Sequence, residues 1–98
     1  MQVTYRNKKL EKTCTNAKTA ERTYGRDMAD KIHQRIDEIT AAECVEMMIQ
    51  FRIGRCHLLS QNRQGQYAVD LIHPYRLVFE QIDGEIRIAN ILEIVDYH

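Results

Sequence analysis

The chain has 98 residues, of which 44% are apolar, and its 14 basic and 14 acidic side chains give no formal net charge. This length predicts one domain, residues 1–98, with no room for two hydrophobic cores. No window approaches the ~18 consecutive apolar residues of a membrane span. The first ten residues lack the apolar core of a signal peptide, so we expect a cytoplasmic protein with no membrane partner.

The charges are distributed unevenly along the chain. Residues 1–26 carry seven basic and two acidic side chains, and residues 52–76 carry four basic and one acidic. The segments 27–51 and 77–98 are acidic. Affinity for phosphates comes mainly from Lys and Arg, so the neutral total argues against strong nucleic-acid binding. The alternation of segments nevertheless allows the folded molecule to present one positive face.

The three cysteines, Cys14, Cys44 and Cys56, form no CxxC pair. In a cytoplasmic chain we expect them to be reduced and to pack as small apolar side chains. A zinc site made from Cys44, Cys56 and His57 is the alternative, although no paired ligand spacing supports it. We therefore expect no metal and no other cofactor.

The N-terminal half is predicted to be mainly helical. After a short strand at Gln2–Tyr5, Asn7 is a suitable N-cap for a helix over Lys8–Thr13, and Asn16 for a second helix over Ala17–Tyr24. Both asparagines can accept a hydrogen bond from an unpaired backbone N–H of the first helical turn. These caps predict where each helix begins.

Residues 26–41 give the strongest helical pattern, because their apolar side chains recur at three- and four-residue spacing. The resulting stripe consists of Met28, Ala29, Ile32, Ile36 and Ile39. Such a stripe is typical of a helix that covers one face of a sheet. His33 lies off the stripe, and we interpret it as a surface histidine. A further helical turn is expected within residues 43–49.

Residues 67–98 contain three successive strand patterns, at Tyr67–Leu71, Tyr75–Ile82 and Glu85–Val95. Asp83-Gly84 predicts a two-residue type I′ turn between the last two, because both central residues tolerate positive φ. A strand near Cys56–Leu59 is expected to pair with the first of the three. Helices followed by antiparallel strands predict an α+β fold, with N-terminal helices packed on one face of a small antiparallel sheet.

Side chains that can transfer protons or bind phosphate accompany these strands: His57, Arg76, Asp96, Tyr97 and His98. Cleavage of RNA without a metal needs a base for the 2′-hydroxyl, an acid for the leaving 5′-oxygen and a cation near phosphorus. Histidine suits both proton roles, since its unperturbed pKa of ~6.5 lies near neutrality. Arginine forms a planar fork that matches phosphate oxygens, and tyrosine can stack on an unpaired base.

Each of these residues also has a structural interpretation. His57 can be a structural histidine whose ring nitrogens are hydrogen-bonded within the fold. Arg76 can pair with Glu80 or Glu93 across the sheet. Asp96 can be a solvated chain end, and Tyr97 a core aromatic side chain. An unbroken last strand would place Asp96 and His98 on one face and Tyr97 on the other, whereas a bulge would change this arrangement.

The run Tyr75-Arg76-Leu77-Val78-Phe79, the dipeptide Asp83-Gly84 and the final Asp96-Tyr97-His98 resemble the closing half of HigB toxins of the RelE/ParE toxin superfamily. Arg55-Cys56-His57-Leu58 supports the resemblance, which covers essentially the whole chain. These toxins are the plasmid maintenance killer proteins of type II toxin–antitoxin systems.

The resemblance implies a ribosome-dependent mRNA endonuclease (an mRNA interferase) that inhibits translation and is neutralised by a helix-turn-helix, HigA-like antitoxin. It implies His57 and His98 as the acid/base pair, Asp96 as an orienting group and Tyr97 as a stacking or positioning group. Arg76 and, more weakly, Arg63 would bind RNA phosphate. Two alternatives remain: a non-catalytic, ParE-like inhibitor of DNA gyrase, and an inactive relative that only binds an antitoxin.

Overall fold

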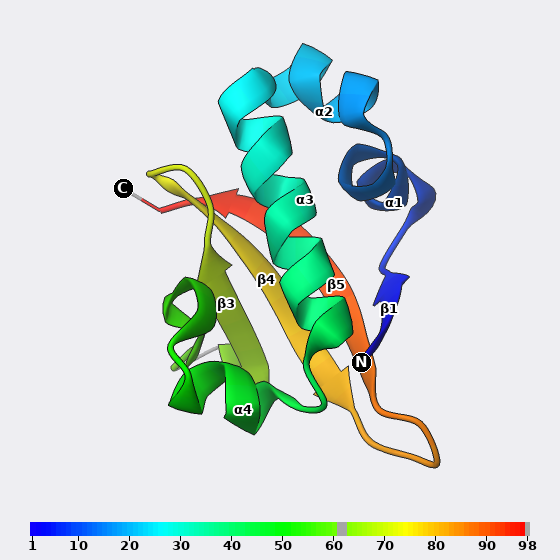
Figure 1. Ribbon diagram of the computed structural model, residues 1–98, viewed down its shortest axis with the longest axis vertical. Helices are drawn as coiled ribbons and strands as arrows, with labels where there is room; N and C mark the ends of the chain where they lie inside the picture. Colours follow the sequence, from blue (N-terminus) through cyan, green and yellow to red (C-terminus); the bar gives the residue numbers. More distant parts are fainter. Residues whose placement is uncertain (61–62, 98) are drawn as a thin grey trace.

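The computed structural model describes residues 1–60 and 63–97, and it is an α+β fold, as the sequence predicts (Figure 1). In these residues one sheet has the strand order β1-β5-β4-β3-β2. Its strands are β1 (Gln2–Tyr5), β2 (His57–Leu58), β3 (Gln66–Asp70), β4 (Tyr75–Ile82) and β5 (Ile88–Asp96). The helices are α1 (Lys8–Thr15), α2 (Ala17–Tyr24), α3 (Arg26–Ala41), α4 (Val45–Gln50) and the short 3-10 helix η1 (Ile53–Arg55). None of the helices described is long and apolar enough to cross a membrane.

The sheet is mixed rather than wholly antiparallel. Strands β2 to β5 pair antiparallel with one another, as expected, but β1 joins the outer edge of β5 in parallel, with Gln2 opposite Ile88 and Tyr5 opposite Ile91. The chain between β1 and β5 is long, since it contains the helices and β2 to β4, and only a long connection allows two paired strands to run in the same direction. Hydrophobic pattern carries no information about strand direction.

The two predicted asparagine caps set the starts of α1 and α2. The Asn7 side chain accepts a hydrogen bond from the backbone N–H of Leu10 (2.8 Å), and the Asn16 side chain accepts one from Thr19 (3.1 Å). Asn16 also ends α1, which is therefore two residues longer than predicted. One asparagine thus separates two helices without an intervening loop.

Helix α3 covers one face of the sheet and buries the predicted apolar stripe (Figure 1). Four of the five stripe residues are buried, Ile36 being half-buried, and they pack in one cluster with Leu77, Phe79 and Ile91 of the sheet. His33 lies at the surface only in part, because it is half-buried and its Nε2 atom is covered. Helix α3 packs against α1 and α2, so side chains beside the apolar stripe are also partly covered.

The connection between β4 and β5 is longer than the predicted two-residue turn. Ile82 is opposite Ile88, so residues 83–87 form the loop, and the backbone of Gly84 is not left-handed. The alternation of Glu85-Ile86-Arg87 resembles a strand in sequence. Ile86 is 62% exposed, however, and burial therefore provides little free energy to extend the strand that far.

A β-bulge in β5 determines which face its last residues occupy. Glu93 is opposite Val78 and Ile91 is opposite Phe79, so Leu92 is an extra residue on β5. Before the bulge, Ala89 and Ile91 face the helices; after it, Ile94 does. Because side chains alternate along a strand, Tyr97 points to the opposite side of the sheet, which we call the open face.

Candidate active site

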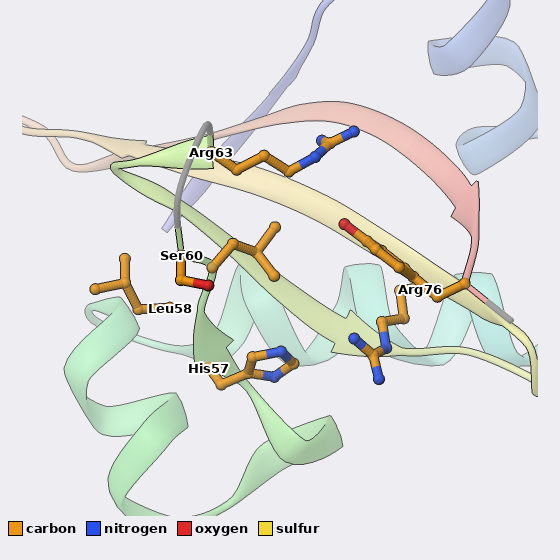
Figure 2. Close-up of a pocket in the computed structure, with 7 residues that line it drawn as sticks. His57, Leu58, Ser60, Arg63 and Arg76 are labelled. Carbon is orange, nitrogen blue, oxygen red and sulfur yellow. The ribbon is translucent and has the colours of Figure 1, made fainter.

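The open face carries a cavity of about 450 Å³, lined by His57, Leu58, Leu59, Ser60, Arg63, Arg76 and Tyr97 (Figure 2). Figure 2 shows the His57 ring directed toward Arg76, with Arg63 on the other side of the cavity. The structure therefore brings together four of the six predicted site residues, although they come from β2, β4, the β2–β3 loop and the end of β5.

Strand register explains how these residues meet. His57 is opposite Ala68, Ala68 is opposite Val78, and Val78 is opposite Glu93, so one row on the open face crosses four strands. Three strand spacings of ~4.8 Å separate the ends of this row by roughly 14 Å. Ala68 and Val78 are fully buried yet lie outside the helix-side core cluster. Small apolar side chains thus form the middle of the row between polar ends.

Arg76 lies in the neighbouring row, directly opposite Asp70 of β3 and Val95 of β5. Its Nε atom is 3.5 Å from Oδ1 of Asp70, and its Cζ atom lies 4.8 Å from the centre of the Tyr97 ring. The sequence suggested Glu80 or Glu93 as structural partners. Asp70 holds the ion pair instead, because register places it directly across the strand pair.

Arg63 is paired on the other side of the cavity. Its Nη2 atom is 2.6 Å from Oε1 of Glu93, and its Nη1 atom donates a hydrogen bond to Gln66 (3.3 Å). Glu93 therefore neutralises Arg63 locally. The two side chains are 37% and 31% exposed, so water screens the pair in part and a phosphate can compete for the guanidinium.

The His57 ring is oriented by the backbone. Its Nδ1 atom lies 2.9 Å from the carbonyl oxygen of Arg55. A carbonyl oxygen can only accept a hydrogen bond, so Nδ1 carries the hydrogen. In the neutral ring Nε2 then has the lone pair and can accept a proton.

Of the last two residues that the structure describes, Asp96 and Tyr97, only Tyr97 lines the cavity. The Tyr97 backbone N–H donates to the carbonyl of Pro74 (2.9 Å), which continues the β4–β5 pairing beyond the strand. Asp96 is exposed, is opposite Tyr75 and does not line the cavity, because adjacent residues of a strand point to opposite faces. The predicted catalytic residue His98 lies outside the described residues.

Sequence reasoning did not identify Arg55 and Asp70 as members of this site. The Asp70 carboxylate accepts hydrogen bonds from Nε and Nη2 of Arg55 as well as pairing with Arg76. The hydrogen bond and the negative charge of Asp70 raise the pKa of Arg55. Asp70 is the single acidic residue among the four arginines of residues 52–76, and this was the signal available in the sequence.

Two of the three cysteines pack in the interior of the protein. Cys14 and Cys56 are almost fully buried, and desolvation raises the pKa of each thiol to about 12. All three thiols are free. Across residues 1–60 and 63–97, no three His, Cys, Asp or Glu side chains are arranged to hold a metal ion.

The fold is that of known toxins. A YoeB/ParE toxin from Agrobacterium tumefaciens aligns over 100% of both chains with a TM-score of 0.69 and 10% sequence identity. A YoeB-YefM complex from Staphylococcus aureus contains a chain that aligns over 100% of this chain and 97% of its own length, with a TM-score of 0.64 and 21% identity. No protein-family model and no curated protein sequence matches the chain.

Proposed function

We propose that this protein is the toxin of a type II toxin–antitoxin system and acts in the cytoplasm as a ribosome-dependent mRNA endonuclease of the HigB-like kind. The observation that carries the proposal is the cavity on the open face of a toxin-like fold, where His57, Arg76 and Tyr97 line one space. These are the residue types that metal-independent RNA cleavage requires.

The proposed chemistry begins with an in-line attack of a ribose 2′-oxygen on the adjacent phosphorus. His57 Nε2 and His98 serve as the base that takes the 2′-hydroxyl proton and the acid that protonates the leaving 5′-oxygen. The reaction forms a 2′,3′-cyclic phosphate and a 5′-hydroxyl, so atoms and protons balance without a cofactor. Arg76 binds the phosphate oxygens, where charge grows during the reaction.

Tyr97 and Asp96 have supporting roles in this proposal. The Tyr97 ring lines the cavity and can stack on an unpaired base while it supports Arg76. Asp96 keeps the proposed role of a group that orients an imidazole or the sugar. Arg63 is a secondary phosphate ligand, because Glu93 already neutralises it.

Local charge supports binding of an anion despite the neutral total. Around the cavity, Arg55, Arg63 and Arg76 face Asp70 and Glu93, which leaves one net positive charge when His57 is neutral. A single excess cation is weak electrostatic support for RNA binding. The ribosome is therefore proposed to supply much of the placement of mRNA.

A partner antitoxin belongs to the same proposal. One of the structural neighbours was solved as a YoeB-YefM complex, that is, with a second protein bound to it. We expect a small helix-turn-helix, HigA-like protein to neutralise this chain, and a neighbouring reading frame encoding one would support the assignment.

The test is induced expression in bacterial cells without an antitoxin. We expect growth and protein synthesis to stop and primer extension to show cut mRNA, whereas His57→Ala and Arg76→Ala should restore growth. Arg87→Ala is the matched control, because Arg87 pairs with Asp83 in the loop at the other end of the sheet. Intact mRNA with lost DNA supercoiling would favour the gyrase alternative, and normal growth with folded protein would favour the inactive relative.

A further inference from the structure

We propose that Asp70 is a positioning residue for the site: its carboxylate holds Arg76 at the cavity and, through Arg55, orients the His57 ring that is directed toward Arg76. This inference rests on the proposed nuclease function for its catalytic consequence. Its structural part concerns the free protein and can be tested without cleavage.

Asp70 is itself firmly anchored. Its backbone carbonyl accepts a hydrogen bond of 2.6 Å from Nε of Arg35, which lies on α3. Nη1 of the same arginine donates to Glu38 at 2.8 Å, one helical turn further along. The end of β3 is therefore tied to the helix layer, and the Asp70 carboxylate projects to the open face from a fixed backbone.

One carboxylate contacts two guanidinium groups. Oδ2 of Asp70 accepts from Nε of Arg55, while Oδ1 lies 3.4 Å from Nη2 of Arg55 and 3.5 Å from Nε of Arg76. All three residues, together with Tyr97, line a recess of about 60 Å³ beside the main cavity. Two cations on one anion leave one positive charge, so Arg76 can bind phosphate while Asp70 still holds it in place.

The contact between Asp70 and Arg55 holds an unfavourable backbone conformation in place. Arg52 and Arg55 have φ values of 55° and 51°, and Gly54 between them has 57°. A left-handed conformation costs about 1–2 kcal/mol for a residue other than glycine. The turn also packs tightly, since a Cβ atom added at Gly54 would lie 2.9 Å from Nε of Arg35. The Arg55–Asp70 ion pair opposes relaxation of this turn.

The turn at residues 52–55 orients His57, the proposed base. The carbonyl oxygen of Arg55 lies 2.9 Å from Nδ1 of His57 and fixes the hydrogen on that nitrogen. Nε2 is then the basic nitrogen. If the Arg55 backbone relaxed, the carbonyl would move and the ring would lose both its orientation and its single tautomer.

The experiment compares Asp70→Asn with Asp83→Asn, which removes an exposed carboxylate 3.8 Å from Arg87 in the β4–β5 loop. Nitrogen-15 NMR of the ring nitrogens of His57 at alkaline pH reports the tautomer in the free protein. Single-turnover cleavage is measured on ribosomes carrying a short synthetic mRNA. We expect the wild type and Asp83→Asn to have the Nδ1–H tautomer and equal rates.

Asp70→Asn should give a mixture of tautomers and cleave about tenfold more slowly at saturating ribosome, because proton transfer contributes a large part of the rate. Asp70→Glu should restore the single tautomer. Arg55→Gln breaks the same link from a side chain that is 70% exposed, and it is the variant to use if Asp70→Asn does not fold.

A wild-type tautomer in both Asp70→Asn and Arg55→Gln, with cleavage within twofold of normal, would overturn the inference. Failure of the wild type to cleave mRNA would overturn the proposed function instead. In that case the NMR spectra of the free proteins still decide whether Asp70 positions His57.

Discussion

The guanidinium of Arg76 lies over the ring of Tyr97, with its Cζ atom 4.8 Å from the ring centre. The arginine is second in β4 and the tyrosine follows β5, so the contact joins adjacent strands on the open face. The contact is possible because the bulge at Leu92 shifts the alternation of side chains along the rest of β5 by one residue. Without the extra residue, Tyr97 would point toward the helices.

This contact predicts different effects for two substitutions of Tyr97. Tyr97→Leu removes the ring face and should weaken binding of ribosome-bound mRNA by about 1 kcal/mol, roughly fivefold, which is the strength of an exposed cation–π contact. Tyr97→Phe keeps the ring and should bind and cleave nearly as well as the wild type. Complete loss of cleavage in Tyr97→Phe would contradict this, since the hydroxyl would then be a chemical participant.

The Arg63–Glu93 pair predicts a substitution that strengthens RNA binding. Glu93→Gln removes the negative charge 2.6 Å from Nη2 of Arg63 and frees the guanidinium for phosphate. One added phosphate contact should steepen the dependence of log affinity on log salt by ~0.7 for a single strand. The measurement is binding of a short mRNA to the protein across a range of salt concentrations.

Glu85→Gln provides the control for that experiment. It makes the same change of charge in the β4–β5 loop, at the other end of the sheet from the cavity. An equal change of salt dependence in both variants would show that only the overall charge matters, and that Arg63 does not bind phosphate.

The helical half of the molecule was largely predictable, because its signals are local. Asn7 and Asn16 mark helix starts through contacts only three residues long. The stripe of α3 is read from four-residue spacing alone. The pairing of residues 57 and 58 with β3 also followed from adjacent hydrophobic runs.

Four of the six predicted residues line the cavity, but the geometry that brings them together could not be predicted from the sequence. One extra residue at Leu92 decides the face of Tyr97, and bulges have no reliable sequence signal. The parallel pairing of β1 depends on the path of the helices, which no local pattern encodes. Asp70 was missed because its role comes from lying opposite Arg76 and near Arg55, and those contacts exist only after the strands pair.

The buried thiols predict how stability depends on pH. Burial raises the pKa of Cys14 and of Cys56 from 9.0 to about 12. The unfolded chain therefore releases these protons near pH 9 while the folded chain keeps them, so the free energy of unfolding should fall as the pH rises from about 9 toward 12. Urea unfolding of the wild type and of Cys14→Ala measures this. An identical alkaline decline in both proteins would contradict the assignment to Cys14.

The shared cap at Asn16 predicts a loss of stability at one exposed residue. Its side chain accepts from the N–H of Thr19 and its backbone ends α1. Asn16→Ala should reduce the free energy of unfolding by about 1 kcal/mol, which corresponds to ~4–8 °C in Tm for a domain of this size. Asn16→Gly should cost only a few tenths of a kcal/mol. Thermal unfolding of both variants tests the cap, and equal losses would argue against it.

The most direct test of the proposed chemistry is the structure of the RNA ends after cleavage on the ribosome. The purified protein is incubated with ribosomes carrying a defined mRNA, and a second mRNA has a 2′-O-methyl group at the cleaved nucleotide. We predict a 2′,3′-cyclic phosphate and a 5′-hydroxyl from the first mRNA and no cleavage of the second. A 5′-phosphate, or cleavage of the methylated mRNA, would contradict the roles given to His57 and Arg76.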